Sequence, residues 1–140
     1  MTMIVELVSP EGILFEGEAS MVVARTLSGD IAFLEGHVPF IGSLAVHPIK
    51  IIMADGTTQV VAAHRGFVEV TGSKVTILSD VAELAAEIDV PRAEQARARA
   101  EEAVRLNAED LEAHAALKRA DVRLGAARGG STTLSPGASH

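Results

Sequence analysis

The stretch HRGFVEVTGSKVTILSDVAELAAEIDVPRAEQARARAEEAVRL, residues 64–106, contains the two kinds of structure that make up the chain. Phe67–Val70 and Lys74–Leu78 are β-rich runs joined by Thr71-Gly72-Ser73, a pattern that predicts a β-hairpin. The residues that follow are dominated by Ala, Glu and Arg, which favour helix. The change in composition near residue 84 therefore predicts a β domain followed by a helical domain.

Upstream of this stretch, short β-rich runs alternate with turn signals. Asp55-Gly56 lies between Ile49–Met53 and Thr58–Ala63 and predicts another hairpin. The remaining β-rich runs are Ile4–Val8, Ile13–Glu18, Met21–Thr26 and Ile31–Leu34. Many short strands at close spacing with little helix predict an antiparallel β-sandwich over residues 1–84.

The helical part contains signals for two helices. Asp89 is a candidate N-cap, and Pro91 suits the first turn of a helix, where its missing N–H is not needed. Asn107 followed by Asp110 resembles a capping box and predicts that a second helix starts there. Alanines recur at helical spacing in both segments, so we expect a closely packed antiparallel two-helix hairpin over 85–128.

Composition excludes several classes of function. A net charge of −7 lacks the basic footprint of a nucleic-acid binder. The absence of cysteine excludes disulfides, Cys-ligated zinc and a thiol nucleophile. No apolar run approaches the roughly 20 residues of a membrane span, and the N-terminus lacks a signal-peptide pattern. We expect a soluble, cytoplasmic chain that reaches a membrane only through partners, with a disordered Ser/Thr/Gly/Pro-rich tail at 129–140.

A search for an active site finds none. The sequence has no G-x-x-x-x-G-K-[ST] phosphate loop and no G-x-S-x-G elbow. The five histidines, at positions 37, 47, 64, 114 and 140, lack H-x-x-x-H or H-E-x-x-H metal spacing. We therefore predict no catalytic residue, no metal site and no required cofactor.

The arginines of the helical part suggest an anion site. An antiparallel hairpin turning near Asn107 places Arg92 opposite residue 122, close to Arg119 and Arg123. Arg92 and Arg99 are seven residues apart and share a helix face. A cluster of guanidinium groups needs an anion to offset its repulsion, and polyphosphate fits because Arg binds phosphate oxygens in a fork.

The same charges also have a simpler interpretation. The second helix begins with acidic residues and ends with basic ones, the order that complements a helix macrodipole. Asp89 would then be only a cap. Sequence physics leaves both interpretations open. The acids are Glu109, Asp110 and Glu112, and the bases are Lys118, Arg119, Arg123 and Arg128.

Four motifs in order resemble the epsilon subunits of F-type ATP synthases. SGDIAFLEGHVPFIGSL (28–44) is similar to their Gly-acid-Ile…Pro-Gly-His-x-Pro-Leu loop. HRGFVEVTGSKVTILSDVAELAAEID (64–89) is similar to the segment that ends their sandwich. IDVPRA (88–93) resembles the Ile/Leu-Asp-x-x-Arg-Ala motif of members that bind ATP, and LKRADVRL (117–124) resembles their basic second helix.

The resemblance implies a non-catalytic rotor subunit. In this family the sandwich binds the gamma subunit and the membrane c-ring, on the cytoplasmic face of the plasma membrane. The helices switch between a compact form against the sandwich and an extended form, which reaches the alpha/beta catalytic head and inhibits ATP hydrolysis. ATP, as a regulatory ligand of the compact hairpin, favours the non-inhibitory form in some members.

The resemblance also assigns residues. Asp30 and His37 match the loop that meets the rotor, while Glu35 stands where the family usually has Pro and Arg65 replaces a Gly. An alternative reading is a sandwich-plus-hairpin adaptor with no nucleotide response. The positions that match the family's ATP site are Glu83, Ile88, Asp89, Arg92, Ala93, Arg99, Arg119 and Arg123.

Overall fold

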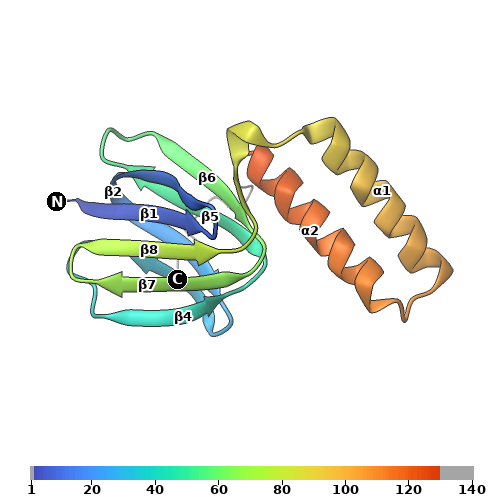
Figure 1. Ribbon diagram of the computed structural model, residues 1–140, viewed down its shortest axis with the longest axis horizontal. Coiled ribbons are helices and arrows are strands. Elements are labelled where there is room, and N and C mark those ends of the chain that lie inside the picture. The colour runs from blue at the N-terminus through green and yellow to red at the C-terminus, as the bar shows by residue number, and fades with distance from the viewer. Residues whose placement is uncertain (1, 130–140) are drawn as a thin grey trace, which may run out of the picture.

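A computed structural model of the chain describes residues 2–129, so the predicted tail at 129–140 lies outside the described residues except for Gly129. Strands come first and two helices follow (Figure 1). The strands are β1 (Met3–Ser9), β2 (Gly12–Thr26), β3 (Gly29–Phe33), β4 (Phe40–Leu44), β5 (His47–Met53), β6 (Thr58–Ala63), β7 (Gly66–Thr71), β8 (Lys74–Ser79) and β9 (Ala82–Leu84). A 3-10 turn, η1 (Ala85–Glu87), leads to α1 (Val90–Leu106) and α2 (Leu111–Ala127).

The strands form the predicted β-sandwich. One layer has the order β1-β8-β7-β4 and the other the order β2-β5-β6-β9, with the 15-residue β2 pairing with β1, β3, β4 and β5 and so joining the layers. All pairings are antiparallel except β1 with β8, which is parallel. The sequence reading missed β4 and β9 because β4 contains a glycine and follows a Gly/Pro loop, and β9 has only three residues.

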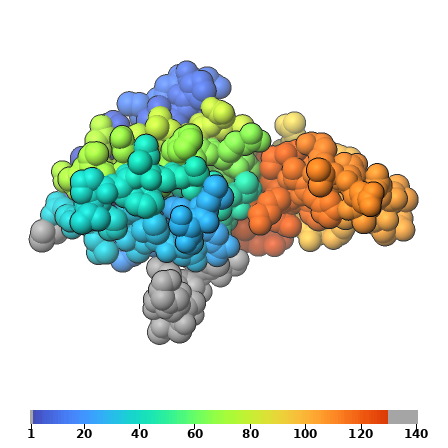
Figure 2. Space-filling model, turned by 90° about the horizontal axis from the view of Figure 1, so that it is seen from below, coloured from blue at the N-terminus to red at the C-terminus, as the bar shows by residue number. Residues whose placement is uncertain are grey.

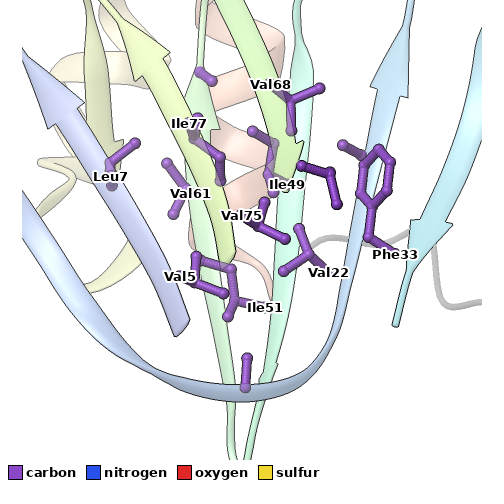
Figure 3. Packing of buried hydrophobic residues seen from close by; sticks show 14 of the residues in the cluster. Val5, Leu7, Val22, Phe33, Ile49, Ile51, Val61, Val68, Val75 and Ile77 are labelled. Atoms are coloured by element: carbon purple, nitrogen blue, oxygen red, sulfur yellow. The ribbon is translucent and has the colours of Figure 1, made fainter. Parts of the chain in front are cut away.

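Alternation along the strands builds the core between the layers (Figure 3). Val5 and Leu7 on β1, and Val75 and Ile77 on β8, point inward with no exposed surface. Each such aliphatic side chain contributes about 1.5–3 kcal/mol when fully buried. Sixteen buried residues form this cluster in the described part of the chain, and Phe33 is its largest side chain without exposed surface.

The helix caps are partly as predicted. The Asp89 carboxylate accepts a hydrogen bond from the Arg92 backbone N–H at 3.1 Å and starts α1, with Pro91 in the first turn. Asp110, and not Asn107, caps α2, since its carboxylate accepts from the backbone N–H three residues on at 3.0 Å. Asn107 instead ends α1. The predicted start of the second helix was therefore three residues too early.

This difference changes the register of the hairpin. Leu106 ends α1 and Leu111 begins α2, so the connection has four residues and Arg92 lies opposite Gly125. The prediction that Arg92 lies opposite residue 122 was wrong, because it placed the turn at Asn107 itself. The correction moves Arg92 about one helical turn away from Arg119.

The hairpin is attached to the sandwich through α2. The helices project from one end of the sandwich, with α2 next to the strands and α1 beyond it (Figures 1 and 2). The outer face of β6 meets α2 in a small apolar cluster. We call this cluster the docking cluster, and its buried members are Val60, Ala62, Ile88, Ala93, Val122, Leu124 and Ala126.

Candidate functional site

An ion pair joins the sandwich to the hairpin beside the docking cluster. Glu83 on β9 pairs in register with Ala62 of β6, which directs its side chain to the face that α2 covers. Arg123 of α2 donates from Nη2 to Glu83 Oε2 at 3.1 Å, and its Nε lies 2.7 Å from Oε1, out of line for a hydrogen bond. The two side chains are only 22% and 30% exposed, so water screens this pair less than a surface pair.

Three of the other predicted ATP-site residues lie at the same junction. Ile88 and Ala93 are buried in the docking cluster, and Asp89 between them caps α1. The segment from Glu83 to Ala93 therefore leads from the last strand into the hairpin and contributes contacts between the sandwich and the hairpin. The contacts that these residues make in the structure are those of a structural junction, and their assignment to an ATP site stays a prediction.

The four predicted arginines lie on one side of the hairpin. Ala93 and Ala100 of α1 face Ala120 of α2 along the buried seam. Arg92, Arg99 and Arg119 each precede one of these alanines by one position, so the helical period of 100° puts them on the same side, and Arg123 follows Arg119 by one turn.

These arginines do not form a bare cationic cluster. Arg119 donates to Glu112 at 2.8 Å, and Arg123 is paired with Glu83. Arg92 and Arg99 are exposed. On the opposite side of the seam, Arg97 of α1 donates to Asp121 of α2 at 2.6 Å and lines a depression of about 580 Å³. The sequence reading missed this interhelical pair because it used the wrong register.

His64 directly follows β6 and feels the charges of Glu83 on β9 and of Arg119 and Arg123 on α2. It is 6% exposed, and its Nδ1 is buried without a hydrogen-bond partner. Burial lowers the pKa of His64; the negative charge of Glu83 opposes this effect, and the positive charges of Arg123 and Arg119 add to it.

The two predicted rotor residues lie on β3 and in the connection that follows it. Asp30 on β3 forms an ion pair with Arg25 at 2.7 Å. His37 lies in the connection between β3 and β4, where Nδ1 donates to the Val38 carbonyl oxygen at 2.7 Å and the ring packs edge-on against Phe33 at 5.0 Å. Both positions are on the sandwich.

A row of apolar side chains crosses the outer face of the β1-β8-β7-β4 layer. Phe67 of β7 pairs in register with Leu78 of β8, and Leu78 pairs in turn with Val8 of β1. On the other side of Phe67, Ile41 of β4 lies diagonal to it. Phe67 is 51% exposed, Leu78 41% and Ile41 68%. We call these four residues the apolar row. The sequence reading missed it, although the inward alternation of the flanking valines on β7 already indicated that Phe67 faces outward.

Two searches give negative results within residues 2–129. No helix there is long and apolar enough to cross a membrane. No group of three or more His, Asp or Glu side chains in this range could hold a metal ion.

The sequence profile of the ATP synthase delta/epsilon chain β-sandwich domain matches residues 2–85. An ATP synthase epsilon chain of Streptomyces griseus is 45% identical over 120 residues, which cover 86% of this chain and 90% of that protein. The chain belongs to the ATP synthase epsilon chain family. Epsilon chains are non-catalytic subunits of the ATP synthase complex.

Further relatives agree in sequence and in fold. An epsilon chain of Brevibacillus brevis is 46% identical over 100 residues, covering 71% of this chain and 75% of its own length. A chain in the structure of Euglena gracilis mitochondrial ATP synthase, described as OSCP/F1/c-ring, shares the fold with a TM-score of 0.78 and 21% identity, covering 91% of this chain and 81% of that one. A chain from the central stalk and c-ring of Tetrahymena thermophila has a TM-score of 0.52 at 17% identity, covering 64% of this chain and 71% of that one.

Proposed function

We propose that this epsilon chain is a rotor subunit whose sandwich binds the gamma subunit and the c-ring, and whose hairpin regulates ATP hydrolysis. The observation that carries the anchoring role is the apolar row, because an exposed contiguous apolar patch on a soluble domain marks a protein interface. The two chains of similar fold come from ATP synthase structures that include the c-ring. In this proposal the chain works at the cytoplasmic face of the plasma membrane without inserting into it, and Asp30 and His37 contact the rotor.

The anchoring role is tested by placing a charge in the apolar row. Phe67→Glu exchanges an outward aromatic ring for a carboxylate, which an apolar interface would have to desolvate. We expect binding to purified gamma subunit to weaken at least about tenfold, equivalent to 1.4 kcal/mol. Thr71→Glu is the matched control, since it adds the same charge to the same face of β7 beyond the row. Equal binding by Phe67→Glu and wild type would exclude this surface.

The regulatory role rests on how the hairpin is held. The docking cluster has seven buried residues, three of them alanines, against sixteen in the sandwich core. Release of α2 therefore exposes little apolar surface and leaves the sandwich intact. The released helices can then reach the catalytic head, where we propose that they inhibit hydrolysis.

We further propose that ATP binds the docked hairpin on the side that carries the arginines. Arg92 and Arg99 are exposed there, and their guanidinium groups suit phosphate oxygens. Arg119 and Arg123 contribute only if phosphate displaces Glu112 and Glu83 from them. ATP shifts the equilibrium toward the docked form only to the extent that it binds that form better.

The same two ion pairs favour a second candidate function, in which the chain couples the catalytic head to the c-ring mechanically and does not respond to nucleotide. If Glu83 and Glu112 hold Arg123 and Arg119 permanently, neither arginine of α2 is available to bind ATP. An NMR titration with ATP separates the two. Saturable shifts of helical amides that disappear in Arg92→Ala/Arg123→Ala but persist in Arg97→Ala/Arg105→Ala support an ATP-responsive hairpin. No shift at millimolar ATP leaves the anchoring role and removes the nucleotide response.

A further inference from the structure

His64 occupies an unusual place for a titratable group. It directly follows β6, whose outer face carries Val60 and Ala62 of the docking cluster. Its Nδ1 lies buried without a hydrogen-bond partner, and 6% of the residue is exposed. A neutral imidazole is tolerated in this position, whereas an imidazolium would carry a buried charge with an unsatisfied N–H.

Three charged groups act on the ring. Glu83 on β9 is the acidic one, and its carboxylate is already engaged by Arg123. Arg123 and Arg119 of α2 are the basic ones, and Arg119 is partly neutralised by Glu112. A proton on His64 thus adds a third positive charge at the interface, this one on the sandwich. The imidazolium would also compete with Arg123 for the Glu83 carboxylate.

We propose that His64 is an acid-sensitive latch of the hairpin: a proton on its buried ring releases α2 from the sandwich. The latch deepens the proposed regulatory function, since release of the hairpin is the step that leads to inhibition. Acidification of the compartment that holds the chain would then act in the same direction as loss of a ligand of the docked form.

The direction of the pH effect follows from proton linkage. Burial and the positive charges of Arg123 and Arg119 on α2 lower the pKa of His64 in the docked form, and in this proposal release of α2 returns it toward its ordinary value of about 6.5. The docked form therefore binds fewer protons than the released form. Docking is at full strength above about pH 6.5 and is lost as the pH falls below that value, by at most about tenfold in the docked-to-released ratio per pH unit for one proton.

Thiol labelling of the full chain measures release, because the sequence has no cysteine of its own. Ala126→Cys places a thiol at a position of the docking cluster that is fully buried, and Ala98→Cys places one at an exposed position of α1. The ratio of the two labelling rates at each pH cancels the ionisation of the thiol and reports the released fraction. We expect this ratio to rise severalfold between pH 7.5 and pH 5.5.

Substitutions identify the group responsible. His64→Gln keeps a polar side chain of similar size and should flatten the pH dependence, whereas His114→Gln, at an exposed position of α2, should leave it unchanged. His47 is half-buried, and burial lowers its pKa as well, so His47→Gln is made in parallel. A pH dependence that survives His64→Gln, or that disappears in His47→Gln, would overturn the proposal.

A measurement on the unsubstituted chain covers the case in which His64→Gln fails to fold. The ring protons of His64 are followed by NMR over the same pH range together with the amides of β6 and α2. Titration of His64 with simultaneous shifts of those amides supports the latch, and titration with no change in them refutes it. The labelling and NMR experiments do not involve the gamma subunit. The latch can therefore fail while the rotor assignment stands, and the rotor assignment can fail while the latch stands.

Discussion

Shortening Val122 should release the hairpin without unfolding the sandwich. Val122 is 5% exposed and faces the sandwich from α2 within the docking cluster. Val122→Ala removes two methyl groups, each contributing about 0.8 kcal/mol, and leaves a small cavity that brings the cost to about 2 kcal/mol. This corresponds to a shift of about 30-fold in the docking equilibrium. Alanine is the better helix former, so α2 itself is not weakened.

The thiol-labelling ratio defined above measures this shift as a rise of about 30-fold in the labelling of Ala126→Cys. Leu111→Ala is the control, because Leu111 is also on α2 and is 82% exposed. In a reconstituted ATPase, Val122→Ala should inhibit hydrolysis more than wild type does. Unchanged labelling would refute the docking cluster as the attachment of the hairpin. Val75→Ala, which shortens a fully buried side chain of the sandwich core, is the reference for unfolding of the sandwich. A urea midpoint of Val122→Ala as low as that of Val75→Ala would show that the hairpin and the sandwich do not separate independently.

Three further experiments test individual contacts. In a double-mutant cycle of Glu83→Gln and Arg123→Gln, we expect a coupling energy of about 1 kcal/mol in the labelling assay, because the pair is half-buried. Additive effects of the two substitutions would mean that the ion pair does not stabilise the docked hairpin. Gly66→Ala should destabilise the sandwich by several times the roughly 1 kcal/mol expected for Gly56→Ala. Gly66 has a φ of +148°, and a Cβ added to it would lie 1.9 Å from a carbonyl oxygen of β8, whereas Gly56 has open space around it. Equal urea midpoints for the two variants would contradict this. Asp89→Ala should cost about 1 kcal/mol of helix stability by removing the cap of α1, seen as faster amide exchange in its first turn.

Local signals in the sequence predicted most of the fold. The Asp55-Gly56 and Thr71-Gly72-Ser73 turns join the strands that they were expected to join, with positive φ at both glycines. Asp89 caps the helix that it was expected to cap. These features depend on neighbours within a few residues, which is the range over which propensity and turn chemistry act.

Features that depend on distant residues were not accessible in the same way. The parallel pairing of β1 with β8 joins segments about 70 residues apart, and no local pattern specifies it. The contact between Glu83 and Arg123 spans 40 positions, and only the resemblance to a family placed both residues in one site. The register of the hairpin failed for a different reason, since moving the turn by a few residues changes every pair of facing side chains.

The division of apolar burial between the two parts agrees with the roles of anchor and switch that we propose. The sandwich core is closed within the described residues, with side chains such as Val5, Val75 and Ile77 fully buried, and no residue of the two helices belongs to it. The docking cluster relies on small side chains and one ion pair, and its free energy must stay within the few kcal/mol that a ligand or a proton can supply. A larger apolar interface would fix the hairpin in place, and a smaller one would leave it released at all times. The alanines at positions 62, 93 and 126 keep the buried interface small. If the hairpin is held as proposed, a proton on the one buried histidine beside them would be enough to shift the docking equilibrium.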